Sequence, residues 1–398
     1  MTKFIPGKTR IEYGGAIIGQ EEKDAINSVI NSQGGRRWTI GPESEAFERE
    51  LAQKTSVRRA VVTNSGSSAL LLALTSLHLP EGSGVIIPAV TFPTAYNVIL
   101  QNNLLPIVVD VDIDSFNLKL TDVWKALNLY RNIETIIAVN IAGNPVDMKR
   151  LREVAGNCTK IILDNCDGYG TTLNGEFIDT YADISCVSFH AAHIITTGEG
   201  GAVLTNNDEY ADRARKLREW GRAGGTDKLY SYPGFPDDYR ERYVFEEIGY
   251  NLKPLELQCA MGRVQLKKLE AFKRKRARNF KELSKVFFKY PQFKTLNYLL
   301  DSDPCWMYFP LFIEGLPRKY VMDNLERNNI ETRTVFSGNI LKHPAYAGIK
   351  SYTAGPLDNA NEIMKKGMFL SVHPTMTMDM IRYIDKTIRE ICLTYSTE

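Results

Sequence analysis

The sequence predicts an α/β protein with a large domain around a mainly parallel sheet and a smaller C-terminal α+β domain. From about residue 57, short β-branched runs alternate with helical stretches, and most of these runs are apolar throughout. Continuous apolar runs are typical of strands buried on both faces of a parallel sheet, with helices as the intervening layers. At 398 residues and 43% hydrophobic content, the chain is long enough for one large core and a smaller second core.

Seven runs are predicted as strands. They are RRAVVT (58–63), GVIIP (84–88), PIVVDVD (106–112), TIIAVNI (135–141), KIILDN (160–165), ISCVSF (184–189) and GAVLTN (201–206). The polar stretch 221–243 has no clean period and is predicted as a long loop. Long loops in compact domains are commonly functional.

A long helix is predicted from Pro254 to about residue 287, because apolar residues recur there at helical spacing. The apolar stripe is Leu255, Cys259, Gly262, Leu266, Leu269 and Phe272. The basic run 273–276 on this helix is interpreted as a solvated face rather than a nucleic-acid contact. We place the domain division before this helix, with the N-terminal segment and large domain in 1–255 and the helix and small domain in 256–398.

Composition disfavours several classes of protein. The formal net charge of +2 indicates neither a nucleic-acid footprint nor a membrane-surface patch. No stretch approaches the roughly 20 apolar residues that span a bilayer, and the first residues lack the apolar core of a secretory signal. The six cysteines are scattered without a CxxC pair, which argues against a disulfide framework and a cysteine-rich metal site. These features favour the cytoplasm and predict no metal.

The first two candidate site segments each follow a predicted strand, where open α/β sheets place their ligands. TNSGSSALLLAL (63–74) passes from a strand through a small polar turn into a helix, so the turn with Ser67 and Ser68 is suited to bind phosphate. An ordinary helix cap is the alternative interpretation. In PAVTFPTAYNVIL (88–100), Phe92 is placed either to stack on a flat ligand or to fill the core.

Two further segments contain charged or titratable groups at strand ends. In KIILDNCDGYG (160–170), Asp164 ends an apolar strand, where a charge is costly unless it is paired, and Asp167 follows three residues later. A cationic ligand and a helix cap are both open as explanations. In SFHAAHIITTGEGGAVLTNN (188–207), His190 and His193 precede a glycine-rich turn. A metal site is conceivable, but two histidines without a third ligand are poor evidence for one.

In this order, the segments resemble the fold-type-I, PLP-dependent sugar aminotransferase family (aspartate aminotransferase-like fold) over nearly the whole chain. The fourth segment of that family resembles SFHATK…TTGEGG, and its lysine forms a Schiff base with the cofactor. Here the sequence is SFHAAHIITTGEGG, so His193 occupies the lysine position and no such Schiff base can form. This histidine is one of three features by which the sequence resembles the 4-keto-6-deoxy-sugar 3-dehydratase branch of the family. The other two are GNP (143–145) and DNCD (164–167).

The resemblance implies an activity and a set of site residues. Pyridoxamine 5′-phosphate (PMP) would bind non-covalently, and glutamate would regenerate it from pyridoxal 5′-phosphate (PLP). The substrate would be a nucleotide-linked 4-keto-6-deoxy sugar that loses its 3-hydroxyl, with His193 as the base. Asp164 would pair with the pyridine nitrogen, Asp167 would face the ring hydroxyl, and Phe92 would stack on the ring. The phosphate would be bound by Gly66, Ser67, Ser68 and Ser188, and by Asn251 from the partner of a homodimer.

Three alternatives stay open at this point. Some enzymes of the branch bind an iron–sulfur cluster through cysteines after a WGR motif. Trp220-Gly221-Arg222 and GYNLK (249–253) resemble that kind, but no cysteine follows before Cys259. TVFSGNILKHP (334–344) instead resembles the GDP-4-keto-6-deoxymannose 3-dehydratase kind. An aminotransferase with a displaced lysine and a non-catalytic sugar-nucleotide binder are the other two alternatives.

Overall fold

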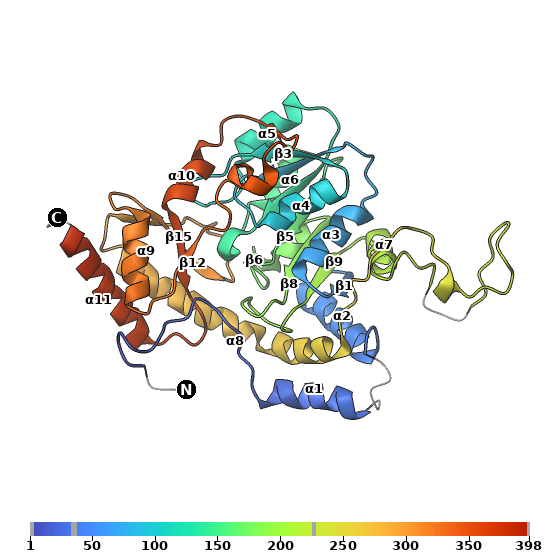
Figure 1. The fold of residues 1–398 in the computed structure, drawn as a ribbon, viewed down its shortest axis with the longest axis horizontal. Helices are drawn as coiled ribbons and strands as arrows, with labels where there is room; N and C mark the ends of the chain where they lie inside the picture. Colours follow the sequence, from blue (N-terminus) through green and yellow to red (C-terminus); the bar gives the residue numbers. More distant parts are fainter. Residues whose placement is uncertain (1–3, 33–37, 225–227, 396–398) are drawn as a thin grey trace.

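The structure is a computed structural model that describes residues 4–32, 38–224 and 228–395. Its main body is an eight-stranded sheet with the order β1-β9-β8-β5-β4-β2-β3-β14 (Figure 1). The strands are β1 (Arg59–Thr63), β2 (Gly84–Pro88), β3 (Leu105–Val109), β4 (Ile133–Val139), β5 (Lys160–Asp164), β8 (Ile184–Ser188), β9 (Gly201–Thr205) and β14 (Tyr352–Thr353). All seven predicted strands are confirmed, although their ends differ by a few residues.

The large sheet is parallel except at β9. Strand β9 pairs antiparallel with both β1 and β8. The reason is local, because β9 follows β8 through the turn 189–200, which contains no crossover helix. Since β1 and β8 are both antiparallel to β9, they run the same way as β5, β4 and β2. The carboxyl ends of these strands therefore meet at one edge of the sheet.

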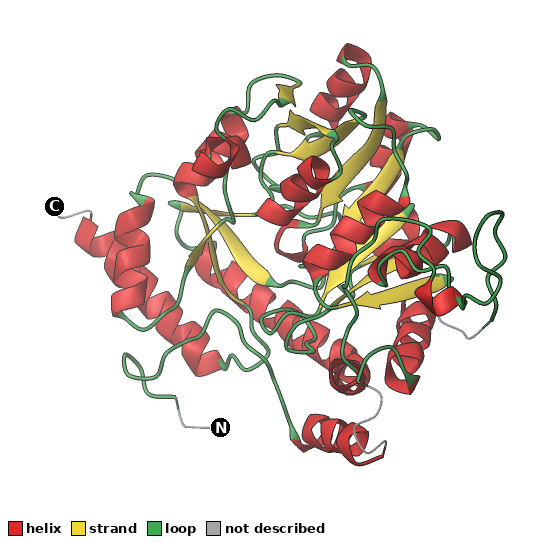
Figure 2. Ribbon diagram, turned by 45° about the vertical axis from the view of Figure 1, so that its right-hand side comes forward, coloured by secondary structure: helices red, strands yellow, loops and turns green. Residues whose placement is uncertain are grey.

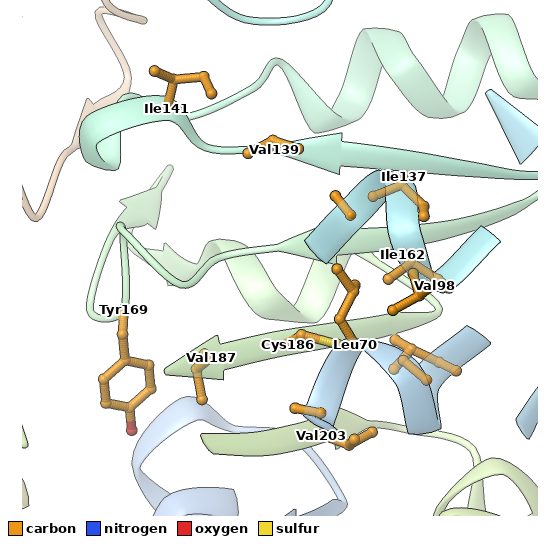
Figure 3. Packing of buried hydrophobic residues seen from close by; sticks show 14 of the residues in the cluster. Leu70, Val98, Ile137, Val139, Ile141, Ile162, Tyr169, Cys186, Val187 and Val203 are labelled. Carbon is orange, nitrogen blue, oxygen red and sulfur yellow. The ribbon is translucent and has the colours of Figure 1, made fainter. Parts of the chain in front are cut away.

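Helices cover both faces of this sheet (Figure 2). Ile137 and Ile162 pack with Leu70 and Val98 on one face (Figure 3), whereas their strand neighbours pack into a separate cluster with α5 and α6 on the other. This burial of both faces explains the continuous apolar runs in the sequence. The helices in the first 218 residues are α1 (Gln20–Ser32), α2 (Pro42–Thr55), α3 (Gly66–Ser76), α4 (Pro93–Gln101), α5 (Leu120–Leu129), α6 (Met148–Ala155) and α7 (Asp208–Arg218).

A second core surrounds a four-stranded antiparallel sheet of order β10-β12-β15-β13. Its strands are β10 (Phe293–Thr295), β12 (Tyr308–Ile313), β13 (Arg333–Thr334) and β15 (Gly367–Ser371), with helices α9 (Arg318–Arg327), α10 (Asp358–Lys366) and α11 (Met378–Tyr395). A small sheet contains β6 (Thr172–Leu173), β7 (Glu176–Phe177) and β11 (Ser302–Asp303). The short 3₁₀ turns are Ile141–Gly143, Ile178–Tyr181, Glu241–Tyr243, Ile340–Lys342 and Pro344–Tyr346.

The 32-residue helix α8 (Glu256–Phe287) extends between the two cores (Figure 1). Two predictions about it are wrong in part. Leu255 is the N-cap and is 42% exposed, so it does not belong to the buried stripe. In the basic run, Lys273 and Arg276 are buried, whereas the two residues between them are exposed. Their three-residue spacing places both on the apolar face, where backbone carbonyl oxygens accept their hydrogen bonds.

Two segments cross the division expected between residues 255 and 256. Strand β14 pairs with β3 of the large sheet, and Ile11, near the start of the chain, packs in the second core and bridges to Ile330. The expected two-domain boundary stays a prediction. After α7 the chain extends outward in a long loop, as predicted for 221–243 apart from 225–227, which lie outside the described residues (Figures 1 and 2). No helix in the described ranges has the length and apolarity needed to cross a membrane.

Candidate active site

A cavity of about 470 Å³ lies at the carboxyl edge of the large sheet and reaches β12 and β13 of the second sheet. Seven of the nine residues predicted for the site line it. They are Gly66, Ser67, Phe92, Asp164, Asp167, Ser188 and His193. Ser68 and Asn251 are not among the lining residues. The strand-end segments thus converge on one site, as the topology requires.

The start of α3 forms a polar seat at one end of the cavity. The Ser65 side chain caps the helix by accepting a hydrogen bond from the Ser68 amide at 3.1 Å. The amides of the first helical residues, Gly66 and Ser67, have no acceptor within the helix and are available to an anion. The Ser68 hydroxyl donates to Asn64 Oδ1 at 2.6 Å, so it shapes the turn rather than lining the cavity.

Two glycines allow this turn to pack against the hairpin of β8 and β9. A Cβ atom at Gly66 would lie 2.6 Å from Ser188 Cβ, and one at Gly201 would lie 2.5 Å from the Ser65 carbonyl oxygen. Both contacts are too short for a side chain, so the close approach requires glycine. This packing brings Ser188 beside the amides at the start of α3.

Phe92 is the N-cap of α4 and is 55% exposed. Its ring lines the cavity and meets the Phe336 ring edge-on, with centroids 6.1 Å apart. Exposure of a large apolar ring inside a cavity is costly unless a ligand covers it. Its position fits a planar group better than it fits the core, which was the alternative expectation.

Asp164 and Asp167 are both buried at the end of β5. Burial raises the pKa of Asp164, although the Cys166 amide donates to its Oδ1 at 3.2 Å. Burial, and then the nearby Asp164, raises the pKa of Asp167 to about 8. Among the described residues no basic side chain forms an ion pair with either carboxyl group. A cationic ring nitrogen would compensate Asp164, so these residues fit a protonated pyridine ring.

His193 lies in the turn between β8 and β9, with its ring facing the same cavity. Burial, and then the neighbouring His190, lowers its pKa to about 3. The imidazole is therefore neutral at physiological pH and is able to accept a proton. Its Nδ1 atom is buried without a hydrogen-bond partner. None of the described residues that line the cavity is a lysine.

His190 and Glu199 also line the cavity. His190 Nε2 lies 3.7 Å from Glu199 Oε1, and its Nδ1 accepts a hydrogen bond from the Ala192 amide at 3.2 Å. The His190 and His193 rings are 5.6 Å apart, edge to face. His190 is thus a neighbour of His193 in the site, and its contacts orient the turn that holds His193.

Sequence reasoning missed three residues of the opposite wall, Tyr13, Tyr308 and Arg333. The two tyrosine rings stack with centroids 4.2 Å apart, and the Arg333 guanidinium lies 4.9 Å from the Tyr13 centroid. Burial raises the pKa of both tyrosines, so their hydroxyls stay protonated. Tyr13 and Tyr308 have no local motif. Arg333 directly precedes the 334–344 segment, and this proximity was the one feature of the sequence that could have indicated a place for Arg333 in the site.

Asn251 lies outside the cavity of its own chain. It is exposed, and its Oδ1 accepts a hydrogen bond from Lys253 Nζ at 2.6 Å. Lys253 in turn lies 3.3 Å from the centroid of the Trp220 ring. The expected contact of Asn251 with a partner subunit's cofactor stays a prediction.

The cysteines do not gather at the site. All six fall within the described residues and are free, with Cys186, Cys259 and Cys305 buried. Cys166 alone lines the cavity. Within the described ranges, no group of three His, Cys, Asp or Glu side chains is arranged to hold a metal ion.

Comparison with known proteins agrees with this geometry. A dTDP-4-dehydro-2,6-dideoxy-D-glucose 3-dehydratase of Saccharopolyspora spinosa is 34% identical over 97% of this chain and 87% of its own length. A GDP-4-keto-6-deoxy-D-mannose 3-dehydratase of Escherichia coli O55:H7 is 30% identical over 92% and 96%. A crystal structure of GDP-4-keto-6-deoxymannose-3-dehydratase with a trapped PLP–glutamate geminal diamine superimposes with a TM-score of 0.88 at 28% identity, over 94% of this chain and 99% of the other.

These likenesses confirm the predicted fold type, a PLP fold-type-I architecture with a mostly parallel large sheet. The sequence profile of the DegT/DnrJ/EryC1/StrS aminotransferase family matches residues 17–389. This match covers nearly the whole chain. The protein belongs to this family of PLP-dependent, sugar-modifying enzymes.

Proposed function

We propose that this protein is a PMP-dependent 3-dehydratase of a nucleotide-linked 4-keto-6-deoxyhexose, with a 4-keto-3,6-dideoxy sugar as its product. One observation supports this most strongly. His193, whose imidazole is neutral at physiological pH, lines the same cavity as the exposed ring of Phe92 and the buried Asp164, and no described lining residue is a lysine. An imidazole moves protons but cannot form a Schiff base with the cofactor, which favours dehydration over transamination.

The remaining residues are suited to hold the cofactor. Bound PMP supplies an amine for the 4-keto group of the sugar and a ring that withdraws electrons. Asp164 holds the pyridine nitrogen protonated, and the start of α3 with Ser67 and Ser188 binds the phosphate. Asp167, protonated near neutral pH, donates a hydrogen bond to the ring hydroxyl. His193 takes the proton from the 4′ carbon and delivers it to the departing 3-hydroxyl oxygen.

Glutamate is the proposed amino donor that restores PMP. The crystal structure similar to this chain contains a PLP–glutamate geminal diamine, which supports this choice for a related enzyme. In each cycle the sugar loses one oxygen atom, glutamate becomes 2-oxoglutarate, and ammonia is released. Atoms and electrons balance in this scheme without an external reductant.

We further propose a homodimer in which Asn251 reaches the partner's cofactor phosphate. Exposed apolar side chains occur on the projecting loop and on the segments next to Asn251 or bridged to its neighbours, which supports an interface in this region. They are Trp38, Trp220, Leu229, Tyr232, Tyr239, Tyr243, Phe245, Ile248 and Leu255. Asn251→Ala should weaken cofactor retention while the dimer persists. Equal cofactor affinity in the variant would count against the shared site.

The iron–sulfur alternative makes a different redox prediction. The wide spacing of the cysteines and their absence from the loop after Trp220 favour turnover without a reductase. The purified protein, given PLP, glutamate and a suitable substrate, should release ammonia and 2-oxoglutarate in air. Activity only after reconstitution with iron and addition of a reductase would favour the iron–sulfur kind. No turnover of any nucleotide 4-keto-6-deoxy sugar would favour a non-catalytic binder.

A further inference from the structure

A second, small cavity of about 10 Å³ lies against His193. His193 lines both cavities, so this small space adjoins the candidate active site at His193. The volume matches about one water molecule, which needs two to four polar partners to be held. The walls provide such partners from four separate parts of the chain, including Gly15, Gln265 and Arg276.

Two of the residues that line this cavity have buried polar atoms without partners. They are His193 Nδ1 and Arg276 Nε. Because neither atom has a partner, the two do not hydrogen-bond directly to each other. The Arg276 guanidinium is otherwise fixed, since its Nη1 donates to the carbonyl oxygens of Trp306 at 3.3 Å and Met307 at 2.9 Å. A buried N–H of a permanently charged group needs an acceptor, and this cavity is where one can lie.

The other polar groups around the cavity limit how a water can be oriented. His373 uses both ring nitrogens, with Nε2 2.9 Å from the Gly15 carbonyl oxygen and Nδ1 2.7 Å from Thr375 Oγ1. The Gln265 side chain donates a hydrogen bond through Nε2 to the Ile17 carbonyl oxygen. Its Oε1 is the acceptor atom of the same amide. The Gly15 carbonyl and Gln265 Oε1 each keep one free lone pair.

We infer that one buried water, bound by Arg276 in this small cavity, accepts the Nδ1 hydrogen of His193 and thereby leaves Nε2 free to act as the base. The water donates its two hydrogens to the carbonyl oxygens of Gly15 and Gln265. Its two lone pairs then receive Arg276 Nε–H and His193 Nδ1–H. Arg276 is a positioning residue, because it acts through the water and does not line the candidate active site. This inference rests on the proposed role of His193 as the base.

The tautomer of His193 is measurable without turnover. Nitrogen-15 NMR of histidine-labelled, cofactor-free protein distinguishes protonated from unprotonated ring nitrogens, and His193→Asn identifies the signals among the five histidines. We expect Nδ1 to be protonated and Nε2 unprotonated in the wild type. A high-resolution crystal structure of the wild type should show one water between Arg276 Nε and His193 Nδ1. A protonated Nε2, or a cavity without a water, would overturn the inference.

Arg276→Lys keeps a positive charge but removes the Nε–H donor. It should shift the His193 tautomer toward protonated Nε2 and lower kcat by roughly 10- to 100-fold, as outer partners of functional histidines do, with KM little changed. Arg274→Lys, an exposed position on the same helix, is the matched control and should change neither. An unchanged tautomer in folded Arg276→Lys protein would contradict the inference. If His193→Asn dehydrated the substrate at the wild-type rate, the proposed function would be wrong. The His193 tautomer measured by NMR would not be affected by that result.

Discussion

The floor and the back wall of the site differ in origin and in task. The floor is formed by the strand-end residues Gly66, Ser67, Phe92, Asp164, Asp167, Ser188 and His193, which all belong to the large sheet and its helices. The back wall is formed by Tyr13, Tyr308 and Arg333, which line the larger cavity, together with Arg276 and His373, which line only the small cavity at His193; they come from the N-terminal segment, α8, the second sheet and the turn after it.

The floor contains the groups that are suited to bind a cofactor and move a proton. The back wall places charge and hydrogen bonds around them. Burial raises the pKa of Asp167 and lowers that of His193, and the positive charge of Arg276, which does not line the larger cavity, opposes the first shift and adds to the second. Substitutions in the floor should therefore remove binding or chemistry, whereas those in the back wall should change protonation.

The largest effect is expected at His193. As the proposed base at the 4′ carbon, it should contribute about 10²–10⁴-fold to the chemical step. His193→Asn keeps a similar size and polarity but cannot accept that proton, so single-turnover dehydration should fall by this factor while PMP still binds. Dehydration at the wild-type rate would place the base elsewhere.

His193→Lys provides the complementary variant. It restores an amine at the position where the family has its cofactor lysine, so borohydride should fix a pyridoxyl group on the protein. The wild type should show no such adduct after digestion and mass spectrometry. A pyridoxyl-lysine in the wild type would favour the aminotransferase alternative.

A smaller effect is expected at Asp164. Asp164→Asn removes the carboxylate proposed to pair with the pyridinium, a charge-assisted hydrogen bond worth about 1.5–3 kcal/mol, or roughly 10- to 100-fold in cofactor affinity. Equilibrium dialysis of PMP checks this, with Asp179→Asn as the control. Asp179 is also buried, but it accepts hydrogen bonds from Ser185 and Asn165 away from the cavity. Unchanged PMP affinity in Asp164→Asn would remove the pairing.

Asp167 should make the cofactor-free protein less stable as the pH rises. Its folded pKa of about 8 lies above the value near 4 of an unfolded aspartate, so the folded state binds the additional proton between these values. This stabilisation is complete below about pH 4 and is lost as the pH rises through 8. Asp167→Asn should flatten that slope in urea unfolding at pH 6 and about pH 8.5. An identical slope in the variant would mean that Asp167 is ionised at neutral pH.

His193 should act in the opposite direction and at lower pH. Its folded pKa of about 3 lies below the value near 6.5 of an unfolded histidine, so the unfolded state binds the additional proton between them. Stability therefore falls as the pH drops from about 6.5 toward 3. His193→Asn should reduce the loss of Tm between about pH 6.5 and pH 4.5. A loss equal to that of the wild type would show that the ring is solvated.

The sequence predicted the floor because each floor residue lies at or just after the end of a predicted strand, within one contiguous run of sequence. Ser67, Phe92, Asp164 and His193 were all found in this way, and the parallel topology then brings strand ends together. The back wall has no such pattern. Arg276 was interpreted as part of a solvated basic run, because its burial depends on helix phase and on backbone carbonyls 30 residues away. Tyr13 and Tyr308 meet only after the N-terminal segment packs onto the second sheet.

Removal of the 3-hydroxyl group from the sugar is measured by the mass of the product. The protein is incubated with PLP, glutamate and a panel of nucleotide 4-keto-6-deoxy sugars, and the nucleotide sugar is recovered for mass spectrometry. We expect a product lighter than its substrate by one oxygen atom, formed with equimolar 2-oxoglutarate and ammonia. A product in which an amino group replaces the 4-keto oxygen, without ammonia release, would contradict this expectation.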